Sequence, residues 1–120
     1  MTEIEKYVKK LPPEAQWIEV PLIKKGKLAM LIDGDIIPEA DSALMYFKIE
    51  PGGEAIPHTH EVDEIDFWLG PGEGELTVEG ETIKIGKNTA TFAPKGAKHS
   101  VKATGDEPIY GIALIRAPKL

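Results

Sequence analysis

The chain has no cysteine, and Arg116 is its single arginine. Without thiols it can form neither a disulfide nor a thiolate metal site, and it has no cysteine nucleophile. Any metal ion must therefore be held by nitrogen and oxygen atoms. Arginine often provides the bidentate contacts that bind carboxylates and phosphates. Its scarcity argues against a densely anionic substrate, although Lys48 or another lysine remains available for that role.

The sequence also lacks a long apolar run and a cluster of basic residues. The longest apolar stretch, Leu28–Ile32, is far too short to span a membrane as a helix. The formal net charge is −6, and the lysines are scattered, whereas nucleic acids and anionic membranes require a basic patch. The N-terminus is charged and shows no apolar signal core. We therefore expect a cytoplasmic protein that binds neither nucleic acid nor a membrane.

Glycine and proline divide most of the chain into short segments rich in β-branched and aromatic residues. This pattern and the length of 120 residues predict one all-β domain, a sandwich or barrel. The expected strands cover residues 17–22, 27–32, 43–50, 64–69, 74–78, 82–85, 89–93, 99–103 and 109–116. Before them, the apolar spacing from Ile4 to Leu11 predicts a short amphipathic helix over residues 2–10, which ends before Pro12 and Pro13.

The three histidines of the chain lie in two short stretches. His58 and His60 belong to the stretch Pro57-His-Thr-His-Glu-Val-Asp-Glu64, and His99 follows the turn signature Pro94-Lys-Gly96. Residues two apart on a strand share a face, so His58, His60 and Glu64 can point inward together. The turn would bring His99 to them from a different part of the sheet.

The same alternation separates neighbouring acidic residues. Glu61 and Asp63 have the opposite parity to Glu64 and should point outward, whereas Asp66 and Trp68 share the inward parity. Asp66 is therefore a candidate acid or base for catalysis. It could equally point outward or orient a metal-bound histidine.

Three imidazoles and one carboxylate are typical ligands of a divalent transition metal. This set favours Fe(II), Mn(II), Ni(II), Co(II) or Zn(II) over Cu(I). Four protein ligands on an octahedral ion leave two positions for water, substrate or dioxygen. The alternative is that these are ordinary surface or core histidines. Six aromatic residues are candidates to line an apolar pocket or simply to form the core: Tyr46, Phe47, Phe67, Trp68, Phe92 and Tyr110.

The two stretches resemble the two sequence motifs of the cupin superfamily. The first motif is matched in spacing by Gly52, His58, His60 and Glu64. Its closing glycine corresponds to Gly72 after a one-residue insertion at Gly70-Pro71, which predicts a bulge or an altered turn.

The second motif is matched by Pro94, Gly96 and His99. Asn88 replaces its first glycine, and asparagine tolerates the left-handed conformation well. Ala103 replaces its final asparagine, a position that is not a metal ligand in the family.

This resemblance covers about residues 43 to 116 and implies a cupin-type β-barrel, a double-stranded β-helix of two antiparallel sheets. A single divalent ion would be held inside by His58, His60, Glu64 and His99. Residues 41–120 would form the barrel, and residues 1–40 an N-terminal helix and arm. The arm, near residues 17–23, would pack on its own barrel or across a partner, since single-domain cupins commonly form homodimers.

The resemblance also implies a range of functions. The first is a metalloenzyme that acts on a small organic molecule inside the barrel, as a dioxygenase, decarboxylase, isomerase or lyase. The alternative is a non-catalytic cupin that binds metal or a small ligand as a sensor or regulatory protein.

Overall fold

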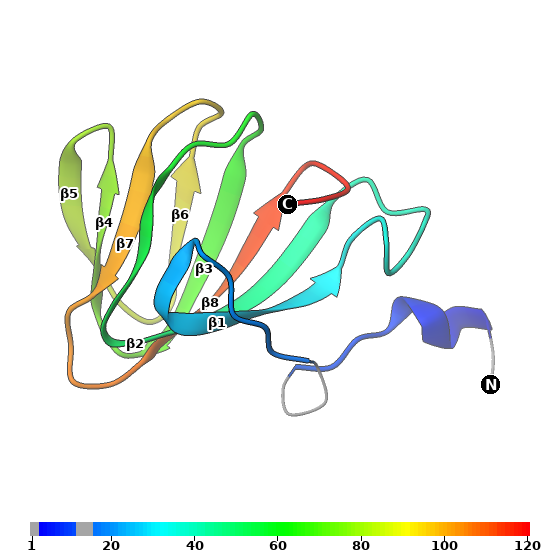
Figure 1. The fold of residues 1–120 in the computed structure, drawn as a ribbon, viewed down its shortest axis with the longest axis horizontal. Helices are drawn as coiled ribbons and strands as arrows, with labels where there is room; N and C mark the ends of the chain where they lie inside the picture. The colour runs from blue at the N-terminus through cyan, green and yellow to red at the C-terminus, as the bar shows by residue number, and fades with distance from the viewer. Residues whose placement is uncertain (1–2, 12–15) are drawn as a thin grey trace.

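Eight strands follow one short turn of helix along the chain (Figure 1). The computed structural model describes residues 3–11 and 16–120. The strands are β1 (Ile23–Ile32), β2 (Ala43–His58), β3 (Glu64–Pro71), β4 (Gly74–Val78), β5 (Glu81–Ile85), β6 (Thr89–Ala93), β7 (His99–Ala103) and β8 (Ile109–Ile115). They form a nearly closed barrel, so the expected all-β cupin-type fold is confirmed.

All strand pairs are antiparallel, in the order β5-β4-β7-β2-β8-β3-β6, and β1 pairs with β2. The long strand β2 joins the two halves of the barrel. Its residues 43–49 pair with β8, and its residues 54–58 pair with β7. Between these halves Gly52 has a φ of 81°, and a Cβ on Gly53 would lie 2.5 Å from the carbonyl oxygen of Lys24. Glycine at both positions therefore lets β2 bend toward β7 and deliver its last residue beside that strand.

Inward side chains of the strands form one apolar core. Trp68, Ile49, Ile109 and Ile115 are its largest fully buried members. Phe47 packs edge-on against Trp68, with ring centroids 5.3 Å apart. Each such side chain contributes roughly 1.5–3 kcal/mol through burial, so the strands that carry the candidate site are firmly held.

The N-terminal expectations are only partly met. Helical structure in the described part is limited to one 3-10 turn at Glu3–Tyr7. Ile4 and Val8 are 68% and 63% exposed, so much of the expected apolar stripe is left in solvent, and a helix this short needs burial of such a stripe. Thr2, Pro12 and Pro13 lie outside the described residues. No helix that the structure describes is long and apolar enough to cross a membrane.

The strand expected over residues 17–22 was wrong. This segment makes only an isolated bridge between Ile18 and Leu28 of β1. Pro21 has no N–H to donate and stands in a turn just before β1. Trp17 instead packs against the ring of Tyr46, with centroids 5.4 Å apart. The other eight expected strands are confirmed, with shifts at their ends.

Candidate metal centre

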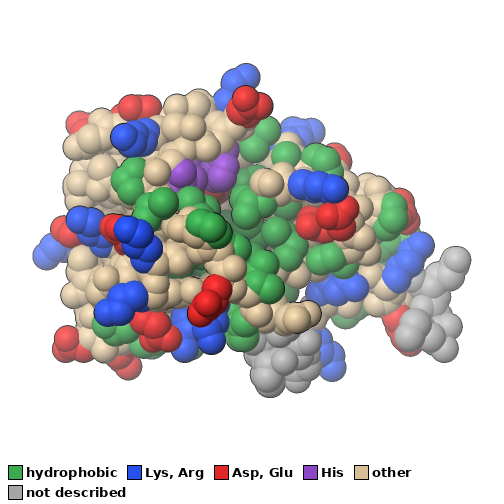
Figure 2. Space-filling model, viewed as in Figure 1, with side chains coloured by type: hydrophobic (Ala, Val, Ile, Leu, Met, Phe, Trp, Pro, Cys, Tyr) green, Lys and Arg blue, Asp and Glu red, His purple; other side chains and the backbone are tan. Residues whose placement is uncertain are grey.

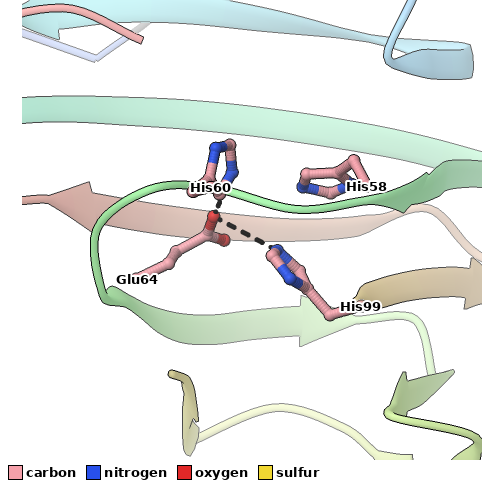
Figure 3. Close-up of side chains that lie close together, drawn as sticks. All are labelled: His58, His60, Glu64 and His99. Carbon is pink, nitrogen blue, oxygen red and sulfur yellow. Dashed lines mark ion pairs between the residues drawn. The ribbon is translucent and has the colours of Figure 1, made fainter. Parts of the chain in front are cut away.

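Four side chains from three strands and one loop meet inside the barrel (Figure 3). His58 is the last residue of β2, and Glu64 and His99 are the first residues of β3 and β7. His60 lies in the loop between β2 and β3. His58 stands opposite His99 in the β2–β7 register. We call these four residues the histidine–glutamate cluster.

The alternation of inward and outward side chains along the chain correctly predicted which of these residues face the barrel interior. Glu61 and Asp63 are exposed, whereas Glu64 is 9% and His99 5% exposed. The extended strand assumed for the whole segment ends at His58. The loop that follows still turns the side chain of His60 toward Glu64.

The spacing of the cluster suits one metal ion. Glu64 Oε1 lies 2.9 Å from His60 Nε2 and 3.4 Å from His99 Nε2. One candidate ligand atom from each of the four side chains lies within 4.8 Å of the others. Two ligands bonded at about 2.1 Å and at right angles to each other would be about 3.0 Å apart. The two distances from Glu64 Oε1 are therefore close to those between neighbouring ligands of a single ion.

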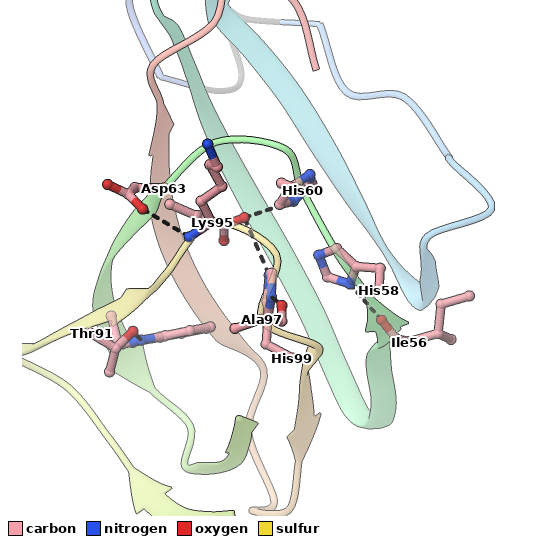
Figure 4. Close-up of polar contacts among 10 residues, drawn as sticks. Ile56, His58, His60, Asp63, Thr91, Lys95, Ala97 and His99 are labelled. Carbon is pink, nitrogen blue, oxygen red and sulfur yellow. Dashed lines mark hydrogen bonds and ion pairs between the residues drawn. The ribbon is translucent and has the colours of Figure 1, made fainter. Parts of the chain in front are cut away.

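Backbone carbonyls orient two of the imidazoles. His58 Nδ1 lies 2.6 Å from the carbonyl oxygen of Ile56, and His99 Nδ1 lies 3.1 Å from that of Ala97 (Figure 4). When Nδ1 donates its hydrogen to a carbonyl, Nε2 keeps a free lone pair, as in protein metal sites. His99 Nε2 is buried without a hydrogen-bond partner. Such an atom is costly to bury unless something coordinates it.

Asp63 has a structural role that the sequence did not reveal. Its Oδ1 accepts a hydrogen bond from the backbone N–H of Lys95 at 2.8 Å. Beside it, the N–H of Gly96 donates to the carbonyl of His60 at 2.8 Å. These bonds join the loop that carries His60 to the turn before His99 (Figure 4). Only its outward parity was readable from the sequence, because the partner is distant along the chain.

Two neighbouring carboxyl groups, those of Glu64 and Asp66, have pKa values shifted in opposite directions. Burial alone would raise the pKa of Glu64, but His99, Asp66 and His60 beside it lower that pKa to about 2. Burial and the adjacent Glu64 raise the pKa of Asp66 to about 10. Glu64 faces imidazoles and keeps the negative charge. Asp66 has no cation beside it and keeps the proton.

Comparisons with known proteins decide the family. The family model for the cupin domain matches residues 45–114, more than half of the chain. The chain belongs to the cupin family. Its alignment with an uncharacterized protein of Aquifex aeolicus has 32% identity over 69 residues, which is 58% of this chain and 54% of that protein. The match thus spans about half the length of that relative.

Two solved structures illustrate the shared cupin fold. A predicted oxalate decarboxylase from Thermotoga maritima superposes with a TM-score of 0.79 and 22% identity, over 92% of this chain and 98% of that one. A polyketide cyclase from Streptomyces resistomycificus superposes with a TM-score of 0.75 and 23% identity, over 94% and 87%. Identities this low show the fold alone.

Where the sequence of this cupin departs from the family motifs near Gly70 and at Asn88, the backbone changes only locally. The register of β3 against β8 shifts between Trp68 and Gly70, which confirms the expected bulge. A Cβ on Gly72 would lie 2.1 Å from the carbonyl oxygen of Glu107, so only glycine fits there. Asn88 adopts the expected left-handed conformation, with a φ of 61°.

A cavity of about 60 Å³ adjoins the histidine–glutamate cluster. Figure 2 shows the histidines beside apolar side chains on the hollowed face of the molecule. Asp66 lines the cavity, is 4% exposed, and its Oδ1 has no hydrogen-bond partner. Its inward direction is as predicted, and its catalytic role remains a prediction.

Two of the six candidate aromatic residues, Phe47 and Trp68, line this cavity. Phe67 and Phe92 are 40% and 53% exposed, because they sit at outward positions of β3 and β6. Tyr46 and Tyr110 stack on each other with centroids 5.8 Å apart and lie outside the cavity lining. Composition alone could not assign these side chains to faces.

We expect metal affinity to fall on acidification, by roughly tenfold per pH unit once one imidazole proton must be displaced. Burial alone would lower the pKa of His99, but the Glu64 carboxylate outweighs it and raises the pKa above the ordinary value of 6.5. Burial lowers the pKa of His58, so that ring stays neutral. Competition with the proton therefore begins above pH 6.5 and strengthens below it. Zinc titrations between pH 5.5 and 8 measure this, and a flat profile would contradict it.

Proposed function

We propose that this cupin is a metal-dependent enzyme that converts a small organic molecule inside the barrel. The observation that carries the proposal is a cavity whose wall contains both the histidine–glutamate cluster and the buried carboxyl group of Asp66, whose Oδ1 has no hydrogen-bond partner among the described residues. Four protein ligands leave positions open on an octahedral ion, and those positions would face the cavity.

The residues would divide the work as follows. The three imidazoles and Glu64 would hold the ion, which when bound would polarise an oxygen atom of the ligand. Asp66 would exchange a proton with that ligand as a general acid or base, since its buried side chain lines the same cavity as the cluster. This supports proton-transfer chemistry, of the isomerase, lyase or decarboxylase type, over dioxygenase chemistry.

A non-catalytic binding protein is the second candidate. The predominantly apolar wall of the cavity favours it, because few groups besides Asp66 could take part in chemistry. The two candidates differ in what Asp66→Asn would do. An enzyme would lose turnover while retaining its metal, whereas a binding protein would have no turnover to lose. The expected homodimer stays a prediction.

Metal content tests the proposal directly. After reconstitution with Fe, Mn, Ni, Co or Zn and removal of free ions, we expect about one divalent ion per chain for at least one of these metals. Elemental analysis of the desalted protein measures the ratio. A substitution of exposed Glu61 by alanine provides a control that should leave the ratio unchanged. Absence of bound ion with all five metals would reject the proposed function.

A further inference from the structure

The cavity wall offers no cation for a ligand that carries more than one negative charge. Apart from the cluster and Asp66, its described lining residues are all apolar: Leu22, Ile23, Leu28, Met45, Phe47, Ala55, Trp68, Val101, Ala113 and Leu120. The one N–H among these side chains, at Trp68 Nε1, already donates to Thr91 Oγ1 at 2.8 Å. A ligand would therefore find apolar contacts everywhere except at the ion and at Asp66.

The charges around the ion limit what the ligand can carry. A divalent ion brings two positive charges and the Glu64 carboxylate one negative charge, so one positive charge remains with the imidazoles neutral. A singly charged ligand cancels it, whereas a dianion leaves a negative charge without a partner against apolar walls. If Asp66 were ionised, the site would be less positive still, so the conclusion does not depend on its protonation.

The size of the cavity sets a second limit. The cavity of about 60 Å³ is small beside the pockets of about 300–1,000 Å³ that hold drug-sized ligands. It therefore favours a small molecule over one with a large aromatic body.

Asp66 provides the second polar contact. Its side chain is almost fully buried, it lines the same cavity as the cluster, and its Oδ1 has no partner. A polar atom of the ligand beside it would complete its hydrogen bonding.

We infer that the site selects a small oxygen-bearing molecule that is neutral or singly charged, binds the ion through its oxygen atoms, contacts Asp66 and presents an apolar group to the wall. This rests on the proposed function and names its ligand class. Dianions of the same size are selected against.

Pyruvate and oxalate form a matched pair of probes. They have the same number of non-hydrogen atoms and chelate through adjacent oxygens, but pyruvate carries one charge and a methyl group, and oxalate carries two charges. We expect pyruvate to bind the cobalt-loaded protein at least about tenfold more tightly than oxalate, as followed by the visible spectrum of the bound Co(II). Phenylpyruvate, with the same head and a larger body, should bind at least about tenfold more weakly than pyruvate.

A wall variant tests the charge argument separately. Leu22 is half-buried and lines the cavity, so Leu22→Lys can place a cation at its edge without disrupting the core. We expect this variant to shift the preference toward oxalate by about tenfold relative to Leu22→Gln, which adds polarity without charge.

The outcomes separate the two proposals. A protein that does not hold Co(II) would reject the proposed metal function. A protein that holds Co(II) but binds oxalate as well as or better than pyruvate, or responds to neither, would overturn only the inferred ligand class. If Leu22→Lys left the preference for pyruvate over oxalate unchanged, the charge of the cavity wall would not be what sets that preference.

Discussion

Replacing His60 with alanine should lower the affinity for a divalent ion by at least about a hundredfold, while Glu61→Ala should change it by less than about twofold. His60 Nε2 lies 2.9 Å from Glu64 Oε1 within the histidine–glutamate cluster. Glu61 is the next residue, carries a negative charge and is exposed on the other side of the loop. If negative charge near the loop were what attracted the ion, Glu61 would matter more than His60. Competition with a chromogenic chelator at pH 7.5 measures both constants.

Two further variants separate ligand loss from a disturbed loop. His60→Gln fills much of the same space, so a loss of affinity equal to that of His60→Ala would assign the effect to the imidazole. Asp63→Ala removes the acceptor of the Lys95 N–H and should lower affinity by roughly tenfold through loss of positioning. Equal effects of His60→Ala and Glu61→Ala, with both variants folded by circular dichroism, would show that His60 does not bind the ion.

Much of this arrangement was readable from the sequence because alternation in a strand is a geometric rule. Glu64 and Asp66 are inward because both lie at alternate positions of β3. Glu61 is exposed as expected, although it lies in the loop after His58 and not in a strand. The turn at Pro94–Gly96 brings His99 opposite His58, since β7 begins directly after it. Asn88 kept the left-handed turn because its side chain tolerates that conformation.

Other features depend on tertiary contacts and were not readable. The strand expected over residues 43–50 continues to His58, because its two halves pair with different strands. The apolar stripe from Ile4 to Leu11 predicted a helix, but Ile4 and Val8 stay mostly exposed and only a 3-10 turn at Glu3–Tyr7 forms. The lack of a partner for Asp66 Oδ1 also depends on every neighbouring side chain.

Replacing Asp66 with asparagine should stabilise the metal-free protein, by on the order of 1–3 kcal/mol at pH 8. The folded-state pKa of Asp66 is raised to about 10 by burial and by Glu64, whereas an unfolded chain releases this proton near pH 4. Between these values the native state binds the proton and the unfolded state does not, so this group makes stability fall as pH rises. The upper limit is about 1.4 kcal/mol per pH unit. Asparagine has a similar volume and does not ionise, so this position would no longer make the free energy of unfolding depend on pH.

Urea unfolding of the metal-free protein and of Asp66→Asn at pH 5, 7 and 8.5 measures the difference in free energy of unfolding. We expect the difference to widen as pH rises, and Glu61→Gln, a substitution of an exposed carboxylate outside the cluster, to show no such widening. A constant difference would mean that Asp66 ionises as freely in the folded state as in the unfolded chain. A widening difference would show that the buried Asp66 carboxyl lowers the free energy of unfolding as pH rises, and that an amide of the same shape does not. Such a cost is expected where the group serves the chemistry of the cavity, because stability and function often oppose each other at active sites.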